Sequence, residues 1–96
     1  MIAFDWDDSK NESNRAKHDV SFEEARTAFF DADALLMHDP DHSDTEDRFV
    51  LLGRSAADHL LVVCHCYRSE DEVIRIFSAR KARRSEKLSY VARKQS

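Results

Sequence analysis

Glycine and proline are nearly missing from this 96-residue sequence, which has one of each. Disordered and fibrous chains are usually rich in these residues, so their scarcity excludes a flexible or collagen-like chain. With 42% apolar residues, the sequence instead predicts a compact fold built from regular elements. A chain of this length has room for one modest core, so we expect a single domain over residues 1–96.

Long apolar runs and a cationic, apolar leader are also lacking. No run approaches the roughly 20 apolar residues that cross a bilayer, and MIAFDWDDSK does not resemble a signal peptide. The only cysteines, Cys64 and Cys66, lie two residues apart in one apolar run. In a strand their side chains would be about 7 Å apart, too far for an unstrained disulfide. We therefore expect a reduced, cytoplasmic protein.

Basic residues are scarce in the first half of the chain. Residues 1–48 contain five Lys or Arg against fourteen Asp or Glu, whereas residues 49–96 contain ten against five. Seven cations and a single acid fall between Arg80 and Lys94. This asymmetry predicts a nucleic-acid or acidic partner for the basic half. The overall net charge of −4 favours one local site over indiscriminate binding to polyanions.

The apolar pattern predicts an α+β domain with the order β-α-α-β-β-β-β-α. Ser21 followed by Glu24 is a capping box, so a helix is expected from about Phe22 to Phe30. We expect an antiparallel sheet with two N-terminal helices and one C-terminal helix. The other segments are IAFDW, DSKNESNRAKH, ALLMH, RFVLLGRS, HLLVVCHCY, EVIRIFSA and the basic C-terminal stretch.

Three consecutive predicted strands carry cationic or titratable residues: Arg54, His65 and Arg75. Side chains alternate along a strand, so His65 shares its face with Val63 and Tyr67. If the strand registers bring the three residues together, they form a positive pocket with Arg80 and Lys81 at its rim. In the alternative interpretation, each arginine pairs with a nearby acid and His65 is a satisfied core residue.

No metal site is expected. The loop HDPDHSDTED, which includes Asp44, offers hard-metal ligands but lacks the glycine and spacing of an EF-hand, so a solvated turn is favoured. Cys64-x-Cys66 without a second cysteine pair is a weak zinc signal. No serine lies in a nucleophile elbow. We therefore expect neither a metal nor a cofactor.

Three segments together resemble the BrnT family, toxins of bacterial type II toxin–antitoxin pairs with a RelE-like ribonuclease fold. The resemblance runs from about Phe4 to Tyr90 and includes the motifs KH-V-SFEEA, RF-LLGRS and RI-SARKA in the family's order and spacing. The segments are FDWDDSKNESNRAKHDVSFEEARTAF, DPDHSDTEDRFVLLGRS and IRIFSARKARRSEKLSY.

The resemblance implies RNA cleavage that blocks translation, with neutralisation by a BrnA-like antitoxin that carries a ribbon-helix-helix region. It further implies a 2:2 heterotetramer that represses its own promoter, in which the antitoxin contacts the operator DNA. Two residues depart from the family's pattern. Asp19 replaces a usual Gly, which allows a different turn geometry. Arg83 replaces a frequent Thr, which removes a helix cap and about 1 kcal/mol of stability.

Metal-free RNA cleavage needs cations for the charge on the phosphoryl oxygens and groups that accept and donate protons. Arg54, Arg75 and Arg80 are candidates for transition-state stabilisation, because a guanidinium matches the geometry of phosphate. His65 is the first candidate for acid or base and His18 is the second. The expected RNA-binding residues are Lys81, which would position the backbone, and Arg83 and Arg84, which would attract RNA without reading its sequence.

A function from another class is also compatible with the sequence. The domain could be a non-catalytic binding module, or a degenerate toxin kept for promoter repression with a ribbon-helix-helix antitoxin. Its basic half would then dock an acidic protein segment or contribute to operator binding. Growth arrest without the antitoxin favours the enzyme, whereas tight antitoxin binding without RNA cleavage favours the module.

Overall fold

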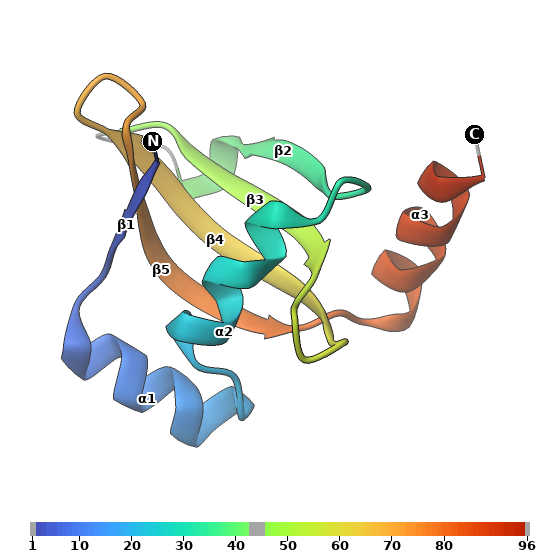
Figure 1. Ribbon diagram of the computed structural model, residues 1–96, viewed down its shortest axis with the longest axis horizontal. Coiled ribbons are helices and arrows are strands. Elements are labelled where there is room, and N and C mark those ends of the chain that lie inside the picture. Colours follow the sequence, from blue (N-terminus) through green and yellow to red (C-terminus); the bar gives the residue numbers. More distant parts are fainter. Residues whose placement is uncertain (1, 43–45, 96) are drawn as a thin grey trace.

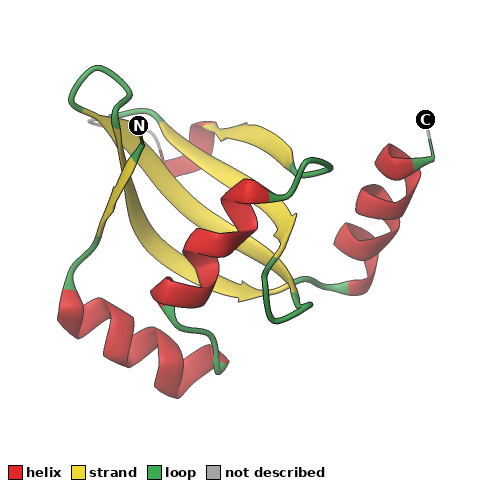
Figure 2. Ribbon diagram, in the orientation of Figure 1, coloured by secondary structure: helices red, strands yellow, loops and turns green. Residues whose placement is uncertain are grey.

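The computed structural model describes residues 2–42 and 46–95. The elements are β1 Ala3–Asp5, α1 Asp8–His18, α2 Phe22–Thr27, η1 Ala28–Phe30, β2 Leu35–Asp39, η2 Pro40–His42, β3 Arg48–Arg54, β4 Leu60–Arg68, β5 Val73–Lys81 and α3 Arg84–Lys94. A five-stranded sheet forms the centre of the fold, with α2 on one face, α1 beside the edge of β5 and α3 beyond one end (Figures 1 and 2). This arrangement confirms the predicted α+β fold.

The strands lie in the order β1-β5-β4-β3-β2. Strands β2 to β5 are antiparallel, as predicted, and β1 departs from the prediction because it runs parallel to β5. A parallel pair needs a long connection, and here nearly the whole chain separates the two strands. Because β1 pairs only with residues 73–75, the rest of β5 has no strand neighbour on that side within the described residues.

Helix α1 is almost entirely polar, and asparagine side chains attach it to the rest of the fold. Asp7 caps its start by accepting from the backbone N–H of Ser9 at 2.8 Å. Asn11 accepts from the backbone N–H of Phe22 at 2.8 Å. Asn14 accepts from the N–H of Ala79 at 3.1 Å and donates to its carbonyl at 2.7 Å. Buried amides therefore replace the apolar stripe that usually attaches a helix to a sheet.

The main core lies between the sheet and α2. Ser21 caps α2 by accepting from the N–H of Glu24 at 3.0 Å, as the capping box predicts, and η1 continues the helical path to Phe30. At Gly53, an added Cβ would lie 2.8 Å from the carbonyl oxygen of Ala28, so only glycine allows η1 to pass this close to β3. The core residues are Val20, Phe22, Ala25, Ala28, Leu51, Leu61, Val63, Ile74, Ile76 and Ala79.

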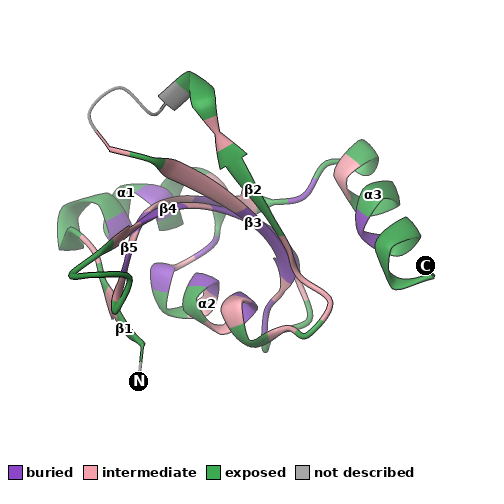
Figure 3. Cartoon of the chain, turned by 90° about the horizontal axis from the view of Figure 1, so that it is seen from above, coloured by how far each residue is buried: buried purple, intermediate pink, exposed green. Residues whose placement is uncertain are grey.

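In the part of the chain that the structure describes, the opposite face of the sheet, which we call the open face, is covered only at one end. There Tyr90 of α3 packs into a smaller cluster with Leu52, Leu60, Val62 and Ala82. Figure 3 shows buried residues along the sheet and α2, while the outer side of α3 is exposed. None of the helices in the described parts of the chain is long and apolar enough to cross a membrane.

Candidate functional site

A bulge in β5 decides which arginines share the open face. Cys66 pairs with Arg75, but Cys64 pairs with Ser78 and Val62 with Arg80, so β5 has one residue more than β4 across this stretch. Arg75 and Arg80 are five residues apart and would face opposite ways in a regular strand. The extra residue brings both to the open face.

Arg54 also lies on the open face, but at its far end. Its guanidinium is 3.3 Å from the Asp58 carboxylate and 5.5 Å from the centre of the Tyr90 ring. Arg54 and Arg80 line different cavities. The three arginines therefore share one face, as the positive-pocket hypothesis requires, without converging on one cavity.

His65 lies on the other face, and its predicted convergence with the arginines is wrong. Its side chain is fully buried, and its ring contacts that of Phe29 with the centroids 4.8 Å apart. The prediction that His65 shares a face with Val63 and Tyr67 is correct. That face is the one that α2 and η1 cover, which explains why an imidazole there cannot reach the open face.

Arg75 and Arg80, both on the open face, bind carboxylates. Arg75 donates to Asp5 at 2.7 Å. Arg80 donates to both carboxylate oxygens of Glu86, each at 2.8 Å. Together with the pair of Arg54, these contacts agree with the alternative interpretation in which each arginine pairs with a nearby acid. The roles proposed for Arg54, His65, Arg75 and Arg80 in catalysis stay predictions.

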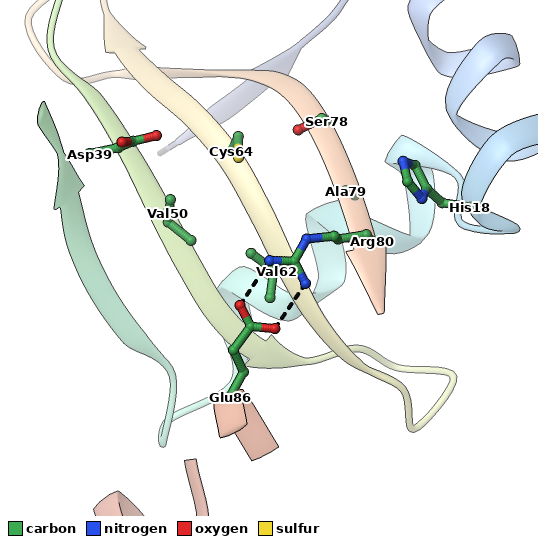
Figure 4. Close-up of a pocket in the computed structure, with 9 residues that line it drawn as sticks. All are labelled: His18, Asp39, Val50, Val62, Cys64, Ser78, Ala79, Arg80 and Glu86. Atoms are coloured by element: carbon green, nitrogen blue, oxygen red, sulfur yellow. Dashed lines mark hydrogen bonds and ion pairs between the residues drawn. The ribbon is translucent and has the colours of Figure 1, made fainter. Parts of the chain in front are cut away.

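A cavity of about 300 Å³ opens on this face, which we call the open-face cavity (Figure 4). Arg80 and Glu86 lie on one side, and His18 approaches from the end of α1 behind the edge of β5. The cavity thus combines a guanidinium, an imidazole and a carboxylate. Its lining residues are His18, Asp39, Val50, Val62, Cys64, Ser78, Ala79, Arg80 and Glu86.

Glu86 has two partners that both favour its ionised form. The hydrogen bonds from Arg80 are the main cause that lowers its pKa to about 2, and the backbone N–H of Arg83 adds a contact of 2.7 Å. A carboxylate with this pKa is a weak base at neutral pH. Glu86 therefore fixes the position of Arg80. It uses two of the five guanidinium N–H groups, and the Lys81 carbonyl accepts a longer bond of 3.3 Å.

Asn14 determines where His18 lies. Its amide pairs with the backbone of Ala79 at the free edge of β5, and it also donates to the carbonyl of Val20 at 2.8 Å. His18 follows four residues later, one helical turn on, and so lies beside the same strand. Reasoning from the sequence missed Asn14, although two asparagines one turn apart in a helix without an apolar stripe were a usable signal.

The remaining predicted RNA-binding residues lie around α3. Lys81 is 3.8 Å from Asp19, and both side chains are substantially exposed. Arg83 and Arg84 are exposed at the start of α3. Arg83 has no acceptor to cap the helix, but Glu86 still binds its N–H, so half of the capping box remains. The expected loss of the whole cap is therefore only partly correct.

The acidic loop does not assemble a metal site among the residues that the structure describes. Nowhere in residues 2–42 and 46–95 do three His, Cys, Asp or Glu side chains gather closely enough to hold an ion. Asp44, one of the possible ligands, lies outside the described residues. Cys64 and Cys66 are both free thiols.

Comparison with known proteins identifies a matching family and a similar solved structure. Residues 6–86 match the model of a family described as the ribonuclease toxin, BrnT, of type II toxin–antitoxin systems. Among solved structures, the chain is similar to the Brucella abortus ribonuclease toxin BrnT, with a TM-score of 0.66 and 20% sequence identity over 88% of this chain and 100% of that one. At this identity the likeness shows a shared fold. No curated protein matches the sequence.

Proposed function

Because the chain belongs to the BrnT family of ribonuclease toxins of type II toxin–antitoxin systems, we propose that it is an endoribonuclease that uses the open-face cavity. The observation that carries this proposal is that Arg80 and His18 both line one cavity. These two side chains supply a guanidinium suited to phosphate and an imidazole that can accept or donate a proton. Both belonged to the set of residues predicted from the sequence.

In the proposed reaction, the ribose 2′-oxygen attacks the adjacent phosphorus and the bond to the 5′-oxygen breaks. The 2′-hydroxyl gives its proton to a base, and the leaving 5′-oxygen takes one from an acid. His18 serves in one of these steps, and Arg80 stabilises the charge on the phosphoryl oxygens. Arg75 and Arg54 extend the cationic surface along the open face. His65, which has no path to that face, has no part in the reaction.

The test compares RNA cleavage by Arg80→Gln and His18→Ala with cleavage by Arg26→Gln. Arg26 is exposed on α2, on the other side of the sheet, and serves as the control for loss of a cation. We expect the two cavity variants to lose roughly 10²- to 10⁴-fold in rate, with folding checked by circular dichroism. If both cleave like Arg26→Gln, the open-face cavity is not the active site.

We further propose that cleavage needs no metal, because arginine and histidine side chains can supply both the charge and the proton transfer. EDTA should leave the rate unchanged. An RNA with a single 2′-deoxy sugar before the cleaved bond should resist cleavage, because the attacking oxygen is missing. Complete loss of activity in EDTA would contradict this part of the proposal and return attention to the acidic loop.

The partner proposed for this toxin is a BrnA-like antitoxin with a ribbon-helix-helix domain, in a 2:2 complex that contacts operator DNA through the antitoxin. Cleavage of RNA in the cytoplasm would inhibit translation. Expression without the antitoxin should therefore arrest growth, and Arg80→Gln should remove the arrest. Growth arrest by an Arg80→Gln protein at equal abundance would show that toxicity does not depend on the open-face cavity.

A non-catalytic binding module is the second candidate, and the arginine–carboxylate pairs favour it. Arg75 and Arg80 are bound to Asp5 and Glu86 rather than left open to a phosphate. A module of this kind would bind the antitoxin tightly and leave RNA intact. The same cleavage assay distinguishes the two functions.

A further inference from the structure

A second cavity, of about 350 Å³, lies between the turn that joins β3 to β4 and helix α3; we call it the turn cavity. Figure 1 shows that this turn and the start of α3 lie at the same end of the sheet. The lining residues are Arg54, Asp58, His59, Leu60, Lys81, Lys87, Tyr90 and Val91.

The turn cavity has an excess of positive charge. Arg54, Lys81 and Lys87 are cations at neutral pH, and Asp58 is the one acid among the lining residues. Its carboxylate is 87% exposed, and the Asp19 carboxylate near Lys81 is 96% exposed. Exposed ion pairs contribute little free energy. An anion that enters the cavity can therefore replace them at small cost.

Lys87 is the most available of these cations. Among the described residues, its ammonium makes no ion pair or hydrogen bond, whereas Arg54 and Lys81 each approach a carboxylate. Lys87 lies on α3, one turn before Val91, and α3 is held in place by the Tyr90 hydroxyl, which donates to Asp31 at 2.7 Å. The helix that carries Lys87 is thus held in place, while the Lys87 ammonium has no close counter-ion among the described residues.

The turn cavity lies next to the open-face cavity, since Leu60 lines the former and Val62 the latter, and these two residues of β4 share the open face. On β5, Arg80 lines the open-face cavity and Lys81 lines the turn cavity. Arg54 pairs with Leu60, and Arg80 with Val62, so the two arginines lie two strands and two residues apart. From strand geometry, their Cα atoms are about 12 Å apart. One single-stranded polyanion can therefore occupy both cavities.

We propose that the turn cavity binds a phosphate group of the RNA strand that flanks the bond cleaved in the open-face cavity. This inference rests on the proposed ribonuclease function. A flanking contact would add affinity for longer substrates without taking part in the chemical step, because Lys87 and Arg54 touch no reacting atom. It would also make the toxin prefer substrates that extend beyond the cleaved bond.

The experiment compares Lys87→Gln with Lys87→Arg and with the control Arg26→Gln. The probes are a single-stranded decamer of 2′-O-methyl RNA for binding, measured by fluorescence anisotropy, and a cleavable decamer and a dinucleoside monophosphate for rates. We expect Lys87→Gln to weaken decamer binding three- to tenfold and to lower the salt slope of binding by about 0.7. Lys87→Arg should restore binding, and the rate on the dinucleoside monophosphate should not change.

The outcomes separate this inference from the proposed function. If the parent cleaves RNA and Lys87→Gln binds the decamer like Arg26→Gln, the turn cavity holds no phosphate and the ribonuclease proposal stands. An equal loss on both substrates overturns the inference, because Lys87 would then act through the fold. If Lys87→Gln lowers affinity for the antitoxin alone, the cavity is a protein contact. If the parent neither binds nor cleaves RNA, both proposals fail.

Discussion

Both ring nitrogens of His65 are engaged within the core. Nδ1 is 3.0 Å from the carbonyl oxygen of Val63, which can only accept, so Nδ1 carries the proton. Nε2 then accepts from the Tyr67 hydroxyl at 3.2 Å. Desolvation lowers the pKa of His65 from its ordinary value, which keeps the ring neutral near pH 7. An imidazole with both nitrogens engaged and no solvent contact is structural.

The structural role of His65 predicts a loss of stability without a loss of chemistry. Replacing it with Ala leaves a cavity beside Phe29 and removes the partners of Val63 and Tyr67. We expect the free energy of unfolding in urea to fall by about 2–4 kcal/mol. The cleavage rate per folded molecule should match the parent within about threefold. A stable His65→Ala protein without activity would return His65 to the catalytic residues.

Asp19 shows what one departure from the family's pattern does. It adopts φ 57° and ψ 35°, the left-handed conformation at the end of α1 that glycine adopts at low cost. The different turn geometry allowed by the sequence is therefore not observed. The backbone keeps the conformation and the aspartate bears the strain, of the order of 1 kcal/mol.

At the scale of elements, α3 depends on one carboxylate. Glu86 binds Arg80 at the end of β5 and the N–H of Arg83 before the helix. Further along, Tyr90 ties α3 to Asp31, which also accepts from the backbone N–H of Arg54 at 2.8 Å. The helix is therefore attached by polar contacts at two points and by the small cluster around Tyr90.

The low pKa of Glu86 predicts how stability changes in acid. Its pKa is about 2 in the folded protein against an ordinary value of 4.5, so its contribution is full above about pH 4.5 and is lost as the pH falls toward 2. After allowance for partial exposure, the loss is roughly 2 kcal/mol. Urea unfolding between pH 2 and 6 should show a steeper decline for the parent than for Glu86→Gln. Parallel curves would mean that the ion pair adds no stability.

The predictable features of these elements were local ones. The capping box at Ser21, the polar helix and the continuously apolar β4 all occur where the sequence indicated them. The candidate site depended on strand register, and one sequence does not fix register. The alternation of side chains placed His65 correctly within its own strand. It did not show which face of the sheet η1 would cover, and η1 packs on the face where Gly53 lies against Ala28. Long-range pairing, rather than propensity, separated His65 from the arginines.

At the scale of the whole molecule, the acidic and basic halves of the sequence form different parts of the structure. The acidic first half supplies α1, α2 and β2, and the basic second half supplies β3 to β5 and α3. Five strand arginines face away from α2, on the open face. They are Arg48, Arg54, Arg68, Arg75 and Arg80. A polyanion is therefore attracted to one side of a protein whose net charge is negative.

This one-sided charge predicts a moderate salt dependence of RNA binding. If about three phosphates are contacted, the slope of log affinity against log salt should be about −2 for a single strand. This slope can be measured by fluorescence anisotropy with the 2′-O-methyl decamer at salt concentrations from about 50 to about 300 mM. A slope near zero would show that these cations do not contact the RNA backbone.

The extra residue of β5 can be lost without exchanging the two faces of the strand. Removing Phe77 alone would leave Ile76 opposite His65 and Ser78 opposite Cys64, so that the strand became regular and Arg80 stayed on the open face while Ala79 stayed in the core. A related chain with β5 shortened at this one position could therefore build its cavity from the same side chains, whereas a deletion elsewhere in the strand would change which residues face the cavity.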